Sequence, residues 1–218
     1  EVSSPVLSTE RLLTVAITPI GNVSRAHTHK FDRALLTHLF VVNETLSLSL
    51  KESWTNSTVQ FEALEQKAPS FSKGALWRSP DQKSAYWWGG HVFAGGAAPK
   101  NLWQFTADNE GGGTWQLANT INRDFLLGYP RTTGASTAVC KGKALYLGGF
   151  ESSATGSSSD GKGRQPVSGL ASYDMEKQRW DKASAAPGFN KFGTSIYGAG
   201  ACAENFGSGG LLFSIGGN

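Results

Sequence analysis

Four histidines are the side chains in this 218-residue sequence that could most readily hold a metal ion. His27 and His29 alternate, so a strand would place both imidazoles on one face, a geometry that some metal sites use. Neither His38 nor His91 stands at a companion spacing, and no cysteine or glutamate does so either. A polar strand edge is therefore the favoured interpretation of this pair, and we predict neither a metal site nor a cofactor.

Side chains for covalent or acid–base catalysis form no recognisable pattern. The sequence contains no Gly-X-Ser-X-Gly elbow, and neither Cys140 nor Cys202 has an obvious histidine partner. The glycines at 111–113 lack the Lys-Ser/Thr of a phosphate-binding loop, so they indicate a connection between strands. The acidic residues show no pairing from which general acid–base catalysis follows.

The composition favours a folded chain of many short strands. Hydrophobic residues make up 39% of the sequence and charged residues 17%, and there are 27 glycines, 7 Trp, 5 Tyr and 12 Phe. This apolar fraction can bury a core, whereas a helical bundle would need more charged residues, Leu and Ala. A net charge of +3 with no adjacent Lys or Arg does not indicate a nucleic-acid partner. No apolar stretch approaches the roughly 20 residues that span a bilayer, so no membrane partner is expected.

A repeated pattern organises the sequence: an apolar strand runs into a Gly-Gly pair, at Gly89-Gly90, Gly148-Gly149 and Gly216-Gly217. A run of small and apolar residues precedes each of these strands. After the first two pairs come an aromatic-containing strand and a strand that carries Trp115 or Trp180. A repeated four-stranded unit is the signature of a β-propeller blade. The glycines would allow close backbone approach, and the Trp would pack between adjacent sheets.

The repeats predict parts of a single propeller domain across residues 1–218. We expect full blades at 72–118 and 134–182, the first half of a blade at 193–218 and a degenerate blade at 26–66. Residues 38–42, 45–50 and 59–64 would be strands of the degenerate blade, and 11–20 would be a strand of the closing blade. These parts make about three and a half blades, and a propeller closes with roughly four to eight.

We therefore expect the remaining blades to come from another chain or from residues beyond this sequence. The sequence starts at Glu1 without a charged and apolar leader, so it is either a mature product or a fragment.

The two cysteines would each end an innermost strand, in successive blades. Because such strands are neighbours, a disulfide between Cys140 and Cys202 is geometrically reasonable, and two free, buried cysteines are the alternative. Three Asn-X-Ser/Thr glycosylation signals, at Asn22, Asn43 and Asn56, fall on predicted turns. With the missing initiator Met, they favour the secretory pathway or an extracellular location.

The order of strands resembles the kelch repeat, and it is most similar to fungal kelch and galactose-oxidase-type propellers. Residues 72–77 before 86–90, and residues 172–174 before Trp180, carry this similarity, which covers about 67–218. The resemblance implies an all-β, kelch-like propeller. Galactose oxidase uses copper with His and Tyr ligands and a Tyr–Cys crosslink. This sequence offers no matching set, so copper chemistry is not expected.

The resemblance also implies a binding face, made by the loops after each Gly-Gly pair and before each innermost strand. These loops mix aromatic rings with single polar or cationic groups, which suits an organic ligand with rings and carbonyls. For any one residue, ordinary loop filling is the alternative. The implied substrate-binding residues are Phe71, Lys73, His91, Phe93, Tyr129, Arg131, Phe150, Asn190, Lys191 and Asn218.

Two functional classes fit this resemblance. Some fungal propellers with this pattern act as hetero-Diels–Alderases in tropolone–sesquiterpenoid biosynthesis, which implies a cofactor-free cyclase of secondary metabolism. Such an enzyme would confine a small hydrophobic substrate and donate a hydrogen bond to its carbonyl, and the sequence assigns no catalytic residue. The alternative is a non-enzymatic secreted kelch module that binds a glycan or a protein. A deep apolar pocket favours the first class, and a flat polar face favours the second.

Overall fold

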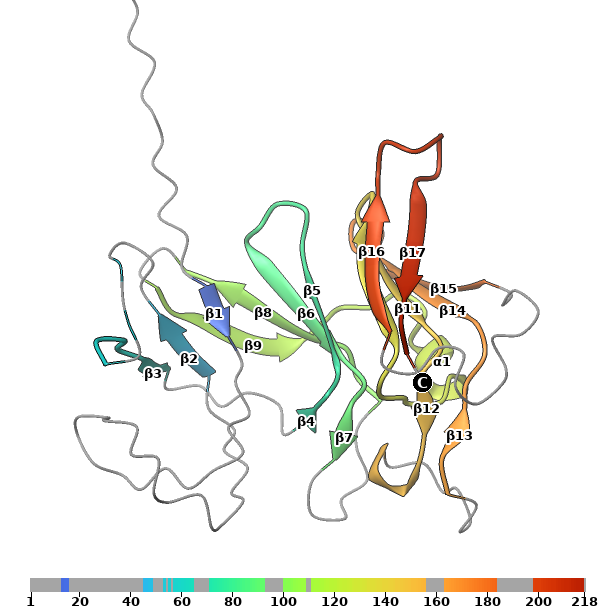
Figure 1. Cartoon of the computed structure of the whole chain (residues 1–218), viewed down its shortest axis with the longest axis horizontal. Coiled ribbons are helices and arrows are strands. Elements are labelled where there is room, and N and C mark those ends of the chain that lie inside the picture. The colour runs from blue at the N-terminus through green and yellow to red at the C-terminus, as the bar shows by residue number, and fades with distance from the viewer. Residues whose placement is uncertain are drawn as a thin grey trace, which may run out of the picture. The chain divides into compact units, whose positions relative to one another are not determined.

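The structure is a computed structural model that describes residues 13–15, 45–48, 53, 55, 57–64, 71–92, 100–108, 111–155, 163–183 and 198–217. These residues form several small antiparallel sheets and one short helix, so the fold is mostly β (Figure 1). The chain divides into a small unit, 1–68 with 107–114, and a large unit, 69–106 with 115–218. The residues of the candidate site all belong to the large unit.

Two four-stranded sheets are the largest elements of the described chain, and each follows chain order from edge to edge. The first contains β5 (Ala75–Arg78), β6 (Ser84–Trp88), β8 (Trp103–Ala107) and β9 (Gly113–Leu117). The second contains β10 (Ser136–Cys140), β11 (Lys143–Leu147), β14 (Leu170–Asp174) and β15 (Arg179–Ala183). The strands expected in the two full repeats are therefore present. The arrangement of the sheets around a propeller axis stays a prediction.

Shorter elements connect and extend these sheets. The hairpin of β16 (Ala199–Ala203) and β17 (Leu211–Ile215) matches the third Gly-Gly repeat. The remaining elements were not expected from the sequence. Two of them are two-stranded ribbons, β4 (Phe71–Ser72) with β7 (His91–Val92) and β12 (Phe150–Glu151) with β13 (Gln165–Pro166). The others are the six-residue helix α1 (Arg123–Gly128) and the 3-10 turn η1 (Ser153–Thr155).

The small unit contains a three-stranded sheet of β1 (Leu13–Val15), β2 (Thr45–Leu48) and β3 (Glu62–Leu64), in that order. Strands β2 and β3 fall within the predicted segments 45–50 and 59–64. The predicted strand at 38–42 lies outside the described residues. Strand β1 belongs to the segment that we expected in a closing blade, and in the structure it pairs antiparallel with β2 instead.

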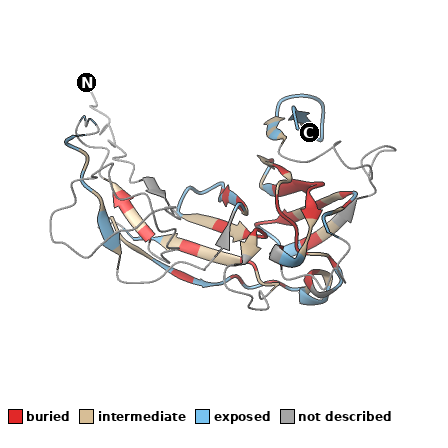
Figure 2. Cartoon of the chain, turned by 60° about the horizontal axis from the view of Figure 1, so that its bottom comes forward, coloured by how far each residue is buried: buried red, intermediate tan, exposed pale blue. Residues whose placement is uncertain are grey.

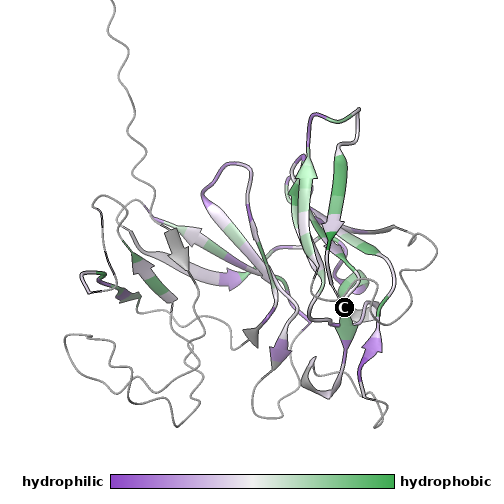
Figure 3. Cartoon of the chain, viewed as in Figure 1, coloured by the Kyte–Doolittle hydropathy of each residue, from purple (hydrophilic) through white to green (hydrophobic). Residues whose placement is uncertain are grey.

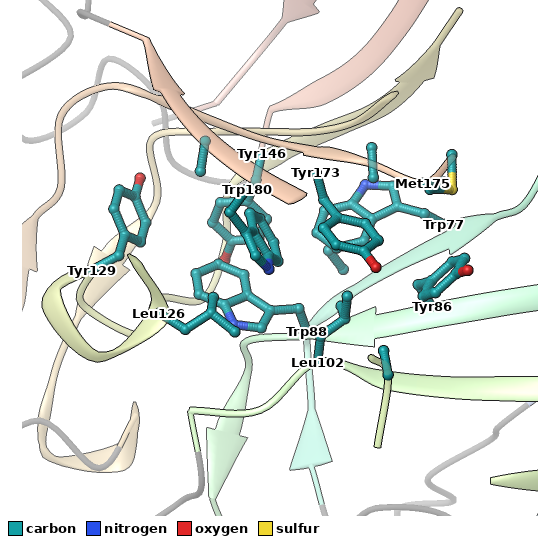
Figure 4. Close-up of a cluster of buried hydrophobic side chains, with 14 of the residues drawn as sticks. Trp77, Tyr86, Trp88, Leu102, Leu126, Tyr129, Tyr146, Tyr173, Met175 and Trp180 are labelled. Carbon is teal, nitrogen blue, oxygen red and sulfur yellow. The ribbon is translucent and has the colours of Figure 1, made fainter. Parts of the chain in front are cut away.

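An aromatic core joins the two four-stranded sheets (Figure 4). Trp180 of β15 lies 6.3 Å from Trp77 of β5 and 5.4 Å from Trp88 of β6, measured between ring centroids. The ring of Phe125 in α1 stacks on Trp180 at 5.8 Å. Each such pair adds about 0.5–1.5 kcal/mol beyond the burial of its area. The expectation that Trp180 packs between adjacent sheets is confirmed.

The alternation of buried and exposed residues along a strand explains how such rings are placed in the core. In β5, alternation buries Ala75 and Trp77 and exposes Leu76 and Arg78, as the period of two in a strand requires. The Trp77 indole N–H then donates a hydrogen bond of 3.2 Å to the carbonyl of Leu145 in the second sheet. The buried face of β5 is therefore fixed by packing and by a directional bond to the neighbouring sheet.

Strand β10 lies next to both β5 and β16, so the first strands of the three repeats are neighbours. The disulfide between Cys140 and Cys202 joins β10 to β16, with a Cα–Cα distance of 5.5 Å, and the predicted pairing is confirmed. At Gly200 of β16, a Cβ atom would lie 2.7 Å from the carbonyl carbon and 2.8 Å from the nitrogen of Thr137. Small residues are thus required where these two strands meet.

We expect Gly200→Ala to lower the free energy of unfolding by about 1–3 kcal/mol, because the new methyl group overpacks the backbone of β10. Gly209→Ala is the matched control, since a Cβ at Gly209 meets nothing within 4 Å. Chemical denaturation of both variants measures the difference. Equal midpoints for the two variants would contradict the close approach of β10 and β16.

Removal of the disulfide tests the same contact between β10 and β16, through its effect on the unfolded chain. The double substitution Cys140→Ala and Cys202→Ala should cost about 2–4 kcal/mol, because the crosslink closes a long loop in the unfolded chain. The two cysteines are 62 residues apart. Reduction of the unsubstituted protein should give a similar loss. An unchanged unfolding midpoint in both experiments would show that the bond does not constrain the fold.

Candidate functional site

A cavity of about 340 Å³ lies where the first strands of the three repeats begin. Such a volume falls in the range of sites that hold small organic molecules. Its walls come from the residues that lead into β5, β10 and β16, together with one tyrosine of β11. The lining residues are Lys73, Gly74, Ala75, Gly134, Ala135, Thr137, Tyr146 and Gly198.

Close packing behind the cavity explains why glycines line it. A Cβ on Gly74 would lie 2.6 Å from the indole nitrogen of Trp87 and 2.8 Å from the carbonyl oxygen of Trp88. A Cβ on Gly198 would lie 2.6 Å from the hydroxyl of Ser136. Backbone therefore excludes a side chain at Gly74, whereas a side chain at Gly198 would displace the Ser136 hydroxyl.

Lys73 supplies the cation of the cavity. Its φ of 57° is in the left-handed region, which a residue with a side chain adopts only when its surroundings hold it there. The Thr133 hydroxyl donates a hydrogen bond of 3.0 Å to the Lys73 carbonyl and so fixes this backbone. Lys73 is exposed and lines the cavity, so its ammonium group is positioned to donate to a ligand there.

The segment 131–133, which leads into β10, lies against both Gly-Gly ends. The Gly90 N–H donates to the Thr132 carbonyl at 2.9 Å, and Thr133 and Phe150 exchange two backbone hydrogen bonds of 3.0 Å each. A Cβ on Gly89 would lie 2.7 Å from the Thr132 carbonyl oxygen. The prediction that the glycine pairs allow close backbone approach is confirmed here.

Arg131 holds this junction together from inside. It is 3% exposed, and its guanidinium donates to the carbonyls of Gly89, at 2.6 Å, and Gly90, at 3.2 Å. Burial lowers the pKa of Arg131 to about 10, so the side chain is still protonated at neutral pH. The contacts make Arg131 a structural cation whose hydrogen bonds are directed at the protein.

His91, Phe150 and Arg164 form a cluster beside the junction. We call these three residues and Lys73 the cation cluster. The Phe150 ring lies 6.4 Å from the His91 ring, and the Arg164 guanidinium lies 4.9 Å from the Phe150 ring centroid. His91 pairs in register with Ser72, the neighbour of Lys73. Burial, followed by the positive charges of Lys73, Arg164 and Arg131, lowers the pKa of His91, so its imidazole is neutral at neutral pH.

Tyr129 belongs to the core. Its ring is 3% exposed and lies 5.8 Å from the ring of Trp88 (Figure 4). The ring of Phe125 lies 5.6 Å from it. Burial raises the pKa of the Tyr129 hydroxyl to about 12. The Tyr129 ring is therefore enclosed by the core and is not placed to contact a ligand. Its packing supports the start of segment 131–133.

The structure brings together some of the predicted binding residues and not others. Lys73 lines the cavity, His91 and Phe150 lie in the cation cluster, and Phe71 pairs in register with Val92 in the β4–β7 ribbon. Four predicted binding residues and the three glycosylation signals lie outside the described residues: Phe93, Asn190, Lys191, Asn218, Asn22, Asn43 and Asn56.

Sequence reasoning missed three residues of this region. Thr137 and Tyr146 line the cavity from within strands, where the loop-based prediction did not search. Tyr146 is fully buried and donates its hydroxyl to the Thr132 carbonyl at 2.8 Å, and burial raises its pKa. Arg164 directly precedes β13, in a connection that the loop-based prediction did not include. A cationic residue in the connection that follows the predicted binding loop at Phe150 was the available signal.

The other features of the described residues, and the comparisons with known proteins, place few further constraints on the function. Among the described residues, no group of three or more His, Cys, Asp or Glu side chains could hold a metal ion. None of the helices in the described part is long and apolar enough to cross a membrane. The disulfide indicates an oxidising environment. No protein-family model and no curated protein matches the chain.

Substitution of Arg131 tests its structural role. We expect Arg131→Met to lower the free energy of unfolding by about 2–4 kcal/mol, because two buried carbonyls lose a charged donor. Arg123→Met is the control, since Arg123 is exposed at the start of α1. Thermal unfolding followed by circular dichroism compares the two. A Tm change as small for Arg131→Met as for the control would contradict the buried hydrogen bonds.

Proposed function

We propose that this chain forms part of a kelch-like β-propeller whose cavity binds a small hydrophobic organic substrate and guides its cyclisation without a cofactor, in a reaction of the hetero-Diels–Alder type. The cavity at the starts of β5, β10 and β16 carries this proposal. It has the volume of a small-molecule site, and glycine, alanine and one tyrosine form most of its lining.

The repeated sheets support the propeller part of the proposal. Two sheets share one strand order, and the first strands of successive repeats are neighbours. A Trp from the fourth strand of the second sheet packs against the sheet before it. These relations are the ones that radial repetition of a four-stranded blade requires.

The chemistry of the cavity supports catalysis by confinement. A pericyclic cyclisation needs no nucleophile or proton shuttle, and it is accelerated when the two reacting parts are held in a reactive conformation. A hydrogen bond to a substrate carbonyl lowers the barrier further by stabilising the charge that develops in the transition state. The Lys73 ammonium and the Thr137 hydroxyl are the candidate donors among the residues that line the cavity.

The hairpin of the third repeat supports the proposal that further blades complete the ring. In both full sheets the second strand pairs on both sides, whereas β17 pairs only with β16 in the described part of the chain. Phe213 and Ile215 of β17 are 40% and 69% exposed, and much of this hairpin is both apolar and exposed (Figures 2 and 3). A third strand from another chain, or from residues beyond this sequence, would cover them.

The same proposal places the protein in the secretory pathway or outside the cell. The disulfide supports this location, because disulfides persist in oxidising compartments.

The test of the proposed activity is incubation of the purified protein with a tropolone quinone methide and a humulene-type alkene. We expect a cycloadduct ratio that differs from the uncatalysed one. Lys73→Asn should reduce the rate about 10²-fold, as loss of one positioned donor does. Asn is chosen because it tolerates the left-handed backbone at this position.

Lys83→Asn is the matched control, since Lys83 is exposed in the turn between β5 and β6 and does not line the cavity. A product ratio equal to the uncatalysed one would overturn the cyclase proposal. Capture of a glycan or protein by the same face, without turnover, would support the non-enzymatic module instead.

A further inference from the structure

We propose that the cation cluster of Lys73, His91 and Arg164 binds an oxyanion group, such as a carboxylate, on the organic ligand that occupies the neighbouring cavity. This inference rests on the proposed small-molecule function and adds the chemical class of the ligand. It does not depend on the cyclisation reaction.

The first support is the one-sided charge around His91. The charges that act on this imidazole come from Lys73, Arg164 and Arg131, and all three are positive. Glu151, the acidic residue of the adjoining β12 strand, pairs in register with Gln165 and is not among them. The charges that act on His91 are therefore all positive, and an anion beside this imidazole would reduce their mutual repulsion.

The second support is a buried polar atom. The Nε2 atom of His91 is buried and has no hydrogen-bond partner among the described residues. Buried polar atoms of native proteins are nearly always paired, so this imidazole nitrogen beside cations marks a position where an oxyanion could supply the missing partner. When protonated, this nitrogen would donate to an oxyanion in a charge-assisted bond.

The third support is the division of roles among the cations. The Arg131 guanidinium donates to the carbonyls of Gly89 and Gly90, so it stabilises the backbone that leads into His91. Arg164 is exposed and lies over the Phe150 ring, which holds its guanidinium in place without using its hydrogen-bond donors. Lys73 lines the cavity itself. A ligand in the cavity would therefore meet Lys73 first and could extend its anionic group toward His91 and Arg164.

The test uses benzoate as the organic oxyanion, benzamide as its neutral analogue and sulfate as the inorganic oxyanion. The imidazole signals of the purified protein are followed by NMR against pH, and the His91 signal is identified by its loss in His91→Gln. We expect saturating benzoate to raise the pKa of His91 by about one unit, because a nearby negative charge favours the imidazolium. Benzamide should leave the pKa of His91 unchanged.

Two variants sharpen the test. Arg164→Gln should weaken benzoate binding about tenfold, whereas Arg78→Gln, at the opposite end of β5 from Lys73, should leave it unchanged. In the unsubstituted protein, benzoate affinity should rise as the pH falls through the range in which His91 titrates, which lies below that of an ordinary histidine, because the imidazolium adds a positive charge to those of Lys73, Arg164 and Arg131. In His91→Gln the affinity should be flat over this range.

Each other outcome overturns the inference. If benzamide shifts His91 as benzoate does, charge does not select the ligand. If sulfate binds and benzoate does not, the site takes a free inorganic ion and is unrelated to an organic ligand. If neither anion shifts His91, the cluster is not an anion site. These measurements need no turnover, so failure of the cyclisation assay and failure of the anion site are distinguishable.

Discussion

The backbone of residues 131–133 is held between the Gly-Gly ends of β6 and β11, and the site depends on this contact. Gly90 donates to Thr132, and Phe150 exchanges two hydrogen bonds with Thr133. The same segment holds the Lys73 carbonyl through the Thr133 hydroxyl. The cavity and the cation cluster therefore share one supporting segment, in which Arg131, Thr132 and Thr133 are all buried. A side chain at either glycine pair would separate the two Gly-Gly ends from this segment and would disturb both features.

The aromatic core gives this segment a rigid base. Trp180 packs against rings from β5, β6 and α1, and the Asn122 side chain bonds to both the N–H and the carbonyl of Trp180, at 2.9 and 2.7 Å. The connection from β9 to β10 is thus attached to the second sheet before it reaches Arg131. Loops that bind ligands need such a support, because a ligand contact loses strength when its supporting groups move. The core and the candidate site are consequently parts of one packing arrangement.

Repetition made the strands predictable, and long-range contacts made parts of the site unpredictable. The Gly-Gly pairs and Trp180 located the two sheets and the hairpin, and the strand ends occupied by Cys140 and Cys202 located the disulfide. The role of Arg131 could not be inferred, because its acceptors are backbone carbonyls 41 and 42 positions earlier in the chain. The ribbons β4–β7 and β12–β13 are two residues per strand, too short for any periodicity to appear. The spacing of residues along the sequence reveals repeats. It does not reveal which loops come together in the folded chain.

Several described residues of the large unit have a buried side-chain polar atom without a hydrogen-bond partner, so each position needs an explanation from its surroundings. The indole nitrogens of Trp88 and Trp180 are two of them, and both rings lie among other aromatic rings of the core. The His91 ring also lies near an aromatic ring, that of Phe150, but the charges that act on this imidazole are all positive. Packing of the fold explains the indoles, because large rings must fill the space between two sheets. It does not explain the imidazole, which a fold without a ligand could replace with an apolar side chain at no loss of packing. The position of His91 beside the cavity is therefore more readily understood as a requirement of binding than as a requirement of folding.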